Sequence, residues 1–254
     1  MADERDDDEM PEGMAWWAEV ARQWGPAILV VLVIRTWVFE PFRIPSGSML
    51  PTLLVGDFVV VNKASYGIYV PATVFDVPFT DGFTAGMPRW ELIDLGDPER
   101  GDIIVFRYPR DERLTFIKRV VGLPGDRISI KRNQVILDDQ PLPMDFEEKV
   151  DIADQYCRSS TLKQYREDLG EVQHAALMQP GGGSLSERPE VVVPEGHVMV
   201  LGDNRDNSED SRAWGFVRYD QIKGKAHFVW MSWDACSGNL GSVRSERLFH
   251  NLYQ

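Results

Sequence analysis

The chain has 254 residues, of which 43% are hydrophobic and 26% are charged, and its formal net charge is −13. This composition is typical of a folded globular protein and excludes a fibrous or wholly disordered chain. The acidic balance provides no overall basic field that could neutralise phosphates, so no nucleic-acid partner is expected. We expect one folded body with an insertion, or two small domains.

An acidic segment opens the chain. Residues 1–12 hold seven Asp and Glu side chains and one cation, Arg5, which gives this segment a net charge of −6. Such a charge run cannot bury enough apolar surface to fold, so we expect residues 1–15 to form a solvated N-terminal tail.

An apolar run, PAILVVLVIRTWVF, follows at residues 26–39. By itself it is too short to cross a bilayer core of roughly 30 Å. A helix from Trp17 to Trp37 would be about 30 Å long, and tryptophans at both ends suit the headgroup region. We therefore interpret residues 16–39 as one transmembrane anchor in the lipid bilayer, with a buried or interfacial helix as the alternative. A cleaved secretory signal is a third interpretation, but it would need a basic segment before the apolar run, and the segment here is acidic. The cations on the two sides of the run are balanced and do not set its orientation.

Short runs rich in β-branched and aromatic residues, each bounded by a turn signal, come next. They predict strands at residues 57–62, 102–108, 115–122, 127–131, 191–193, 197–201 and 227–233. We predict a mainly β fold, in which an antiparallel β-sheet body is preceded by one transmembrane helix. Residues 136–190 are more charged and loop-like, with a short helical stretch expected near residues 162–169, and we interpret them as a smaller inserted domain. The β domain then comprises residues 40–135 and 191–254.

The first candidate for chemistry is a turn with two hydroxyls, at residues 43–53 (RIPSGSMLPTL). Ser46 and Ser48 flank a glycine between Pro45 and Pro51. This arrangement can present one serine on an exposed turn beside a free backbone N–H group. An ordinary tight turn would contain the same residue types, so both interpretations stay open for this segment alone.

The second candidate is Lys118. On a strand, the period of two places it between Phe116 and Val120 on one face. Burial lowers the pKa of an ammonium group, and a lysine held near pKa 7 to 8 would cost on the order of 3 to 5 kcal/mol of stability. Such a lysine could act as a neutral general base. The alternative is a lysine at a strand edge whose amine reaches water.

The third candidate is the polar segment at residues 201–216, LGDNRDNSEDSRAWGF. A series of Asx turns after a strand would explain it. The segment also supplies a hydroxyl, Ser208, that could orient a lysine. Asp210 and Arg212 could form an ion pair that fixes the loop.

Cysteine and histidine usage gives no metal motif. Cys157 and Cys236 lack CxxC spacing, and the four histidines show no HExxH-like pairing, so we expect no metal and no cofactor. The two cysteines are compatible with one disulfide or with two free thiols.

Three sequence motifs follow the apolar segment in the order IPSGSMLPTLLVGD, FIKRVVGLPGD and GDNRDNSEDSRAWG. They closely resemble bacterial type I signal peptidase, also called leader peptidase. The match covers about residues 40–135 and 191–233, and the third string is highly specific. The resemblance implies that Ser48 is the nucleophile, Lys118 the general base and Ser46 a donor to the oxyanion beside the Ser48 N–H. It also implies supporting roles for Ser208, which would position the lysine, and for Asp210 and Arg212.

The same resemblance implies the biology. It makes the chain a serine endopeptidase of the bacterial inner membrane that cleaves signal peptides from exported pre-proteins through an acyl-enzyme, with its catalytic domain on the periplasmic side, near the export machinery. Small side chains at the first and third positions before the cut, as in Ala-x-Ala, would enter shallow pockets walled by Phe42, Ile44, Leu53 and Ile117. These four residues could instead be ordinary core.

Two other functions are compatible with parts of the sequence. A self-cleaving repressor shares the serine–lysine logic, but it should carry a DNA-binding module, and the first forty residues contain no basic helix-turn-helix. A membrane-anchored β domain that only binds peptides or envelope partners would use the serine and the lysine structurally. Comparing activity on a pre-protein peptide before and after Ser48→Ala separates enzyme from binder.

Overall fold

The structure is a computed structural model, and it describes residues 12–70, 90–154, 156–234, 236 and 242–253. Residues 1–11 of the predicted acidic tail lie outside the described residues. One long helix, a four-residue helix α2 (Ser211–Trp214), four β-sheets and several short 3₁₀ turns make up the described chain. The predicted mainly β, antiparallel fold is confirmed.

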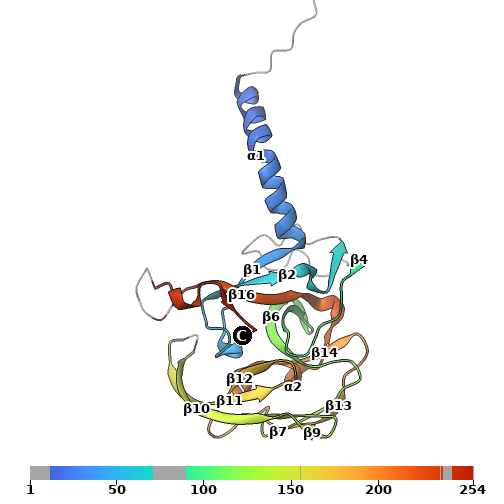
Figure 1. Ribbon diagram of the computed structural model, residues 1–254, viewed down its shortest axis with the longest axis vertical. Helices are drawn as coiled ribbons and strands as arrows, with labels where there is room; N and C mark the ends of the chain where they lie inside the picture. The colour runs from blue at the N-terminus through green and yellow to red at the C-terminus, as the bar shows by residue number, and fades with distance from the viewer. Residues whose placement is uncertain (1–11, 71–89, 155, 235, 237–241, 254) are drawn as a thin grey trace, which may run out of the picture.

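The long helix α1 (Glu12–Trp37) covers the segment predicted as the anchor and contains Pro26. It projects away from the sheets (Figure 1) and exposes large apolar side chains, among them Trp24, Leu29 and Val31. Within the part of the chain that the structure describes, no helix combines the length and the hydropathy needed to cross a membrane. The transmembrane role of residues 16–39 therefore stays a prediction.

The largest sheet has eight strands in the order β1-β2-β16-β5-β6-β14-β15, with β17 paired to β16. Its strands are β1 (Phe39–Arg43), β2 (Asp57–Asn62), β5 (Ile103–Tyr108), β6 (Asp111–Gly122), β14 (His197–Leu201), β15 (Val217–Arg218), β16 (Ile222–Ser232) and β17 (His250–Asn251). Residues alternate between buried and half-buried along β2, as expected for a strand with one face on the core.

Three smaller sheets complete the body. A three-stranded sheet contains β10 (Met144–Ala153), β11 (Ser159–Asp168) and β12 (Gln173–Met178). A four-stranded sheet has the order β13 (Arg188–Val192), β7 (Arg127–Lys131), β8 (Gln134–Leu137) and β9 (Gln140–Pro141), and β3 (Gly67–Val70) pairs with β4 (Trp90–Asp94). The three-stranded sheet lies inside residues 136–190, whose status as an inserted domain stays a prediction.

The predicted helix near residues 162–169 is wrong. Residues 162–168 belong to β11, which pairs with β10 on one side and β12 on the other, and Leu169 follows the strand. Local helix propensity is weak compared with ladder hydrogen bonds on both edges. A cross-strand ion pair between Arg166 and Glu147 and the burial of Leu162 add to this pairing.

A disulfide joins Cys157, in the β10–β11 turn, to Cys236, after β16. The two residues are 79 positions apart in sequence. This bond settles the alternative that the sequence left open between paired and free cysteines. It ties the three-stranded sheet covalently to the end of a central strand of the largest sheet.

Candidate active site

Ser48 lies in a short 3₁₀ turn, η1 (Gly47–Met49), between β1 and β2. The turn is anchored because Met49 and Leu53 are fully buried in the core beneath it. Ser48 itself is 8% exposed, and Ser46 precedes the turn in an extended conformation. The two serine Oγ atoms are 3.5 Å apart, so the predicted pair of hydroxyls does share one location.

Lys118 reaches this turn from β6, 70 positions away in sequence. Its Nζ lies 2.8 Å from Ser48 Oγ and donates to the backbone carbonyl of Ile117, also at 2.8 Å. The amine is 5.4 Å from the ring centre of Phe116, the neighbour expected on the same face. Lys118 is only 4% exposed, so the alternative of a lysine that reaches water is wrong.

Burial changes the acid–base chemistry of this amine. Desolvation lowers the pKa of Lys118 to about 8, even though the nearby carboxylates of Asp210, Asp203 and Glu209 act in the opposite direction. At pH 7 about one molecule in ten then carries the neutral amine. A neutral amine within hydrogen-bond distance of a serine hydroxyl can accept its proton.

The predicted ion pair between Asp210 and Arg212 is present. Arg212 donates from Nε to Asp210 Oδ1 and from Nη2 to Oδ2, both at 2.8 Å, and both side chains are buried. Asp210 Oδ2 also accepts from the backbone N–H of Gly202 at 3.0 Å. Burial raises the pKa of Asp210, but the bonds and charge of Arg212 outweigh this effect and hold the pKa below its usual range.

Ser208 lies near the turn that contains Ser48, but its predicted bond to the lysine is not formed. Its Oγ is buried and has no hydrogen-bond partner among the residues that the structure describes. A β-carbon added at Gly202 would come within 2.2 Å of Ser208 Oγ and 2.5 Å of the Ser48 carbonyl oxygen. A glycine at position 202 therefore lets the two segments approach, while the orienting role of Ser208 stays a prediction.

Sequence reasoning missed a second buried ion pair, next to the lysine. Arg119 donates to Asp203 from Nε at 2.9 Å and from Nη2 at 2.8 Å, and each residue is 1% exposed. Thr52, four residues after Ser48, donates to Asp203 Oδ2 at 2.6 Å. Arg119 and Asp203 both stand inside the strings that carry the resemblance. That position in the sequence does not indicate that the two residues contact each other.

The four residues predicted to wall the pockets lie in one apolar cluster. Ile44, Leu53 and Ile117 are buried in it, and Phe42 packs against it. Ile117 immediately precedes the lysine, and its carbonyl accepts from Lys118 Nζ. Their place in one cluster with Ile117 is compatible with a pocket next to Lys118, and their contact with substrate stays a prediction.

No group of three or more His, Cys, Asp or Glu side chains in the described ranges could hold a metal ion. The arrangement of Ser48 and Lys118 is suited to nucleophilic attack by a serine hydroxyl. A buried serine hydroxyl, an amine of lowered pKa and a second hydroxyl beside the nucleophile are the parts that acyl transfer requires.

The family model and the curated relatives that match this sequence have the same description. The sequence profile of the family described as signal peptidase, peptidase S26, matches residues 17–233. Signal peptidase I of Pseudomonas aeruginosa is 38% identical over 243 residues, covering 91% of this chain and 79% of the relative. Signal peptidase I of Rickettsia typhi is 34% identical over 251 residues, covering 89% of this chain and 90% of the relative. A crystal structure of a signal peptidase I from Enterococcus faecalis aligns with 51% of this chain and 96% of that one, at 27% identity and a TM-score of 0.32.

Proposed function

Because this chain belongs to the signal peptidase family, peptidase S26, we propose that it removes signal peptides from pre-proteins with Ser48 and Lys118 as its catalytic residues. The observation that carries the assignment is the 2.8 Å separation of Lys118 Nζ and Ser48 Oγ, both buried. Lys118 is the base in this proposal because it lies within hydrogen-bond distance of Ser48, whereas no hydrogen bond of the described residues joins a histidine to Ser48. The direct test is cleavage of a pre-protein by the purified chain at a defined bond.

The proposed reaction has two halves. Neutral Lys118 accepts the proton of Ser48 as Oγ attacks the scissile carbonyl, and the ammonium then protonates the departing amine. The product is an acyl-enzyme ester on Ser48 and a free mature protein. A water molecule next gives one proton to Lys118 as its oxygen attacks the ester. The ammonium then returns that proton to Ser48 Oγ as the bond to the signal peptide breaks, so both residues return to their starting state.

The oxyanion needs donors at the moment of attack. The backbone N–H of Ser48 and the hydroxyl of Ser46 are suited to this role, because Ser46 Oγ lies 3.5 Å from the nucleophile. These two donors stabilise an oxyanion most strongly in a site from which water is excluded. Ser48 is only 8% exposed even without substrate.

The pH dependence of cleavage follows from this mechanism. Since only neutral Lys118 is a base, kcat/KM should rise with pH through a midpoint of about 8, the pKa to which burial lowers the amine, and level off above it. The measurement is kcat/KM on a pre-protein peptide between pH 6 and 10. A profile already flat from pH 6.5 upward would contradict lysine as the base.

We further propose that α1 anchors the chain in the bacterial inner membrane and that the residues after Phe39 face the periplasm. Two observations support this. The helix exposes large apolar side chains along its length, and Cys157 and Cys236 are joined in a disulfide, which persists in an oxidising compartment rather than in the cytosol. In that position the site would meet pre-proteins as they leave the export machinery.

The preference for small residues before the cut is proposed to come from the apolar cluster beside the dyad. Tightly packed walls exclude a larger side chain, whereas losing a methyl group from a substrate costs only about 1 to 3 kcal/mol. Ile117→Ala should therefore enlarge a pocket and raise kcat/KM about tenfold or more for a substrate with valine or leucine at the first or third position. Competition between Ala-x-Ala and the larger substrates measures the change.

Leu252→Ala serves as the matched control, because Leu252 is buried in the same cluster but belongs to the C-terminal segment. It should leave the ratio of kcat/KM values for large and small substrates unchanged. An Ile117→Ala enzyme with an unaltered ratio would show that Ile117 is core and does not line the pocket.

A further inference from the structure

The Cys157–Cys236 disulfide lies on the surface of the molecule, where both cysteines are exposed. Cys157 stands in the turn between β10 and β11, next to Tyr156, which is 69% exposed. Cys236 follows the end of β16. A thiolate from solution can reach a disulfide in such a position, and exposed disulfides exchange more readily than buried ones. The bond is therefore a candidate site for thiol–disulfide exchange.

The Cys236 side of the bond is attached to residues 47–57, which run from η1 to the start of β2 and are called the η1–β2 segment below. Trp233, three residues before Cys236, donates from its backbone N–H to the Gly56 carbonyl at 2.9 Å. Cys236 in turn donates from its backbone N–H to Asp234 Oδ1 at 2.9 Å. The cysteine is thus held close to the point where β16 contacts the end of the η1–β2 segment.

The three-stranded sheet, whose hairpin turn carries Cys157, packs against the same segment. Leu50, two residues after Ser48, is buried in this contact and is 2% exposed. Leu54 packs against the same cluster. The side chains that the sheet contributes are all apolar: Leu162, Leu177, Val150 and Ile152. The sheet and the end of β16 therefore both support the η1–β2 segment.

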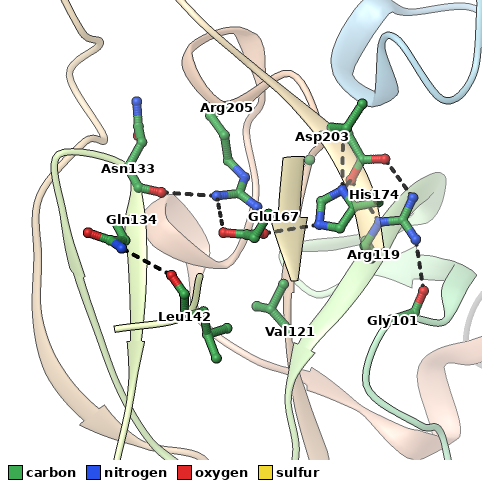
Figure 2. Close-up of polar contacts among 12 residues, drawn as sticks. Gly101, Arg119, Val121, Asn133, Gln134, Leu142, Glu167, His174, Asp203 and Arg205 are labelled. Carbon is green, nitrogen blue, oxygen red and sulfur yellow. Dashed lines mark hydrogen bonds and ion pairs between the residues drawn. The ribbon is translucent and has the colours of Figure 1, made fainter. Parts of the chain in front are cut away.

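A second attachment of the three-stranded sheet lies after β14 (Figure 2). Arg205 donates from Nη1 to Glu167 Oε1, on β11, at 3.1 Å. Its neighbour Asn204 donates from its backbone N–H to the Ser48 carbonyl at 3.1 Å. At this end the sheet is connected to Ser48 through two consecutive residues.

The disulfide is the link at the hairpin turn. For the described residues of that turn, 154 and 156–158, the hydrogen bonds and ion pairs stay within the hairpin. Breaking the S–S bond would free the turn from the end of β16 and leave the attachment after β14 in place. The sheet would then be fixed to the body that carries the η1–β2 segment at one end instead of two.

We propose that the Cys157–Cys236 bond is a redox clasp: a protein dithiol of the thiol–disulfide oxidoreductase class opens and closes it, and the closed clasp holds Ser48 in position for cleavage. The effect on cleavage rests on the proposed function of the site. A clasp of this kind makes full activity depend on the redox state of the compartment in which the enzyme folds.

The exchange reaction balances as a transfer of two electrons and two protons. A thiolate of the partner attacks one sulfur of the bond and forms a mixed disulfide, and the other cysteine leaves as a thiolate that takes up a proton. The second partner thiol, as its thiolate, then breaks the mixed disulfide and releases the first cysteine, which is also protonated. The chain ends with two thiols and the partner with a disulfide, and closing the clasp is the reverse reaction.

The test compares kcat of the oxidised and the reduced wild-type chain on a pre-protein peptide without cysteine. Reduction with dithiothreitol should lower kcat about tenfold, because a small displacement of a reacting group is enough for such a loss. Reoxidation with oxidised glutathione should restore it. The double variant Cys157→Ser, Cys236→Ser is the matched control. It should have the kcat of the reduced chain and should not respond to dithiothreitol.

Amide hydrogen exchange provides a readout that does not depend on cleavage. On reduction, the backbone N–H groups of Gly56 and Trp233 should exchange at least about fivefold faster, because the contact between β16 and the η1–β2 segment loses its outer support. The amides of β7, in the four-stranded sheet, should exchange at an unchanged rate. Equal rates at Gly56 and Trp233 in the two redox states would overturn the proposal.

Two further results would also overturn the clasp. One is a reduced chain with unaltered kcat. The other is a loss of activity on reduction that coincides with loss of the β-sheet circular dichroism signal, because the bond would then stabilise the whole fold. An oxidised chain that cleaves no pre-protein would contradict the proposed function, and the exchange rates would still decide whether the bond holds the η1–β2 segment.

Discussion

Ser48→Ala and Lys118→Met should each lower kcat for pre-protein cleavage by at least about a thousand-fold. The serine is a poor nucleophile until its proton is removed, and Lys118 Nζ, at 2.8 Å, is the base that contacts it. Because the two groups act as a unit, the double variant should be little worse than either single variant. Single-turnover cleavage of a pre-protein, followed by gel shift, measures all three.

Exposed residues of the same types provide the controls. Ser184→Ala and Lys131→Met change a serine and a lysine that lie on the surface, away from the dyad. Both should retain wild-type kcat. Multiplicative losses in the double variant would mean that Ser48 and Lys118 act independently, and full activity in either single variant would exclude the mechanism.

Lys118→Met should also make the folded protein more stable at neutral pH. Burial lowers the pKa of this lysine from 10.5 to about 8. At 1.36 kcal/mol per unit, keeping the amine in place costs up to about 3 kcal/mol, which methionine of similar length would recover. The free energy of unfolding, measured by denaturant titration at pH 7, should rise accordingly.

The free energy of unfolding of the wild-type protein should increase with pH over a defined range. Between pH 8 and 10.5 the unfolded chain binds more protons at Lys118 than the folded chain does, so wild-type stability gains with pH across this window. The advantage of Lys118→Met is therefore largest below pH 8 and smaller by pH 10. Lys131→Met, at an exposed position, should show no such trend. A Lys118→Met variant less stable than wild type at pH 7 would indicate that the packing of the amine, and not its desolvation, dominates.

Local patterns in the sequence were sufficient for the strands that begin and end at turn signals. Strands β2, β7 and β14 have the predicted bounds, since β-branched runs between Gly-Asp or Pro-Gly turns leave few alternatives. Strand β11 was mistaken for helix because its pairing partners, and not its own residues, determine its structure. The approach of Lys118 to Ser48, on which the proposed dyad depends, could be predicted because each residue stands in its own short motif.

The partners that support the dyad were not accessible in this way. Asp203 contacts Arg119 across 84 positions, and Arg205 contacts Glu167 across 38. Neither pair is close enough in sequence for a spacing rule to predict the contact. The sequence of a loop rich in Asp and Asn also does not show whether a given carboxylate is solvated or buried. Only the folded chain shows which charges are removed from water and therefore need each other.

The Cys157–Cys236 bond has a further consequence for the integrity of the enzyme. It closes a covalent ring that contains β11 to β16 and, with them, Ser208, Asp210 and Arg212. The glycine-rich loop at residues 181–184 lies within this ring and is largely exposed. If another protease nicked that loop, the two fragments would remain linked. The piece that carries Ser48 and Lys118 would keep its supporting segment at intramolecular concentration, so a cut chain could still hold an assembled catalytic site.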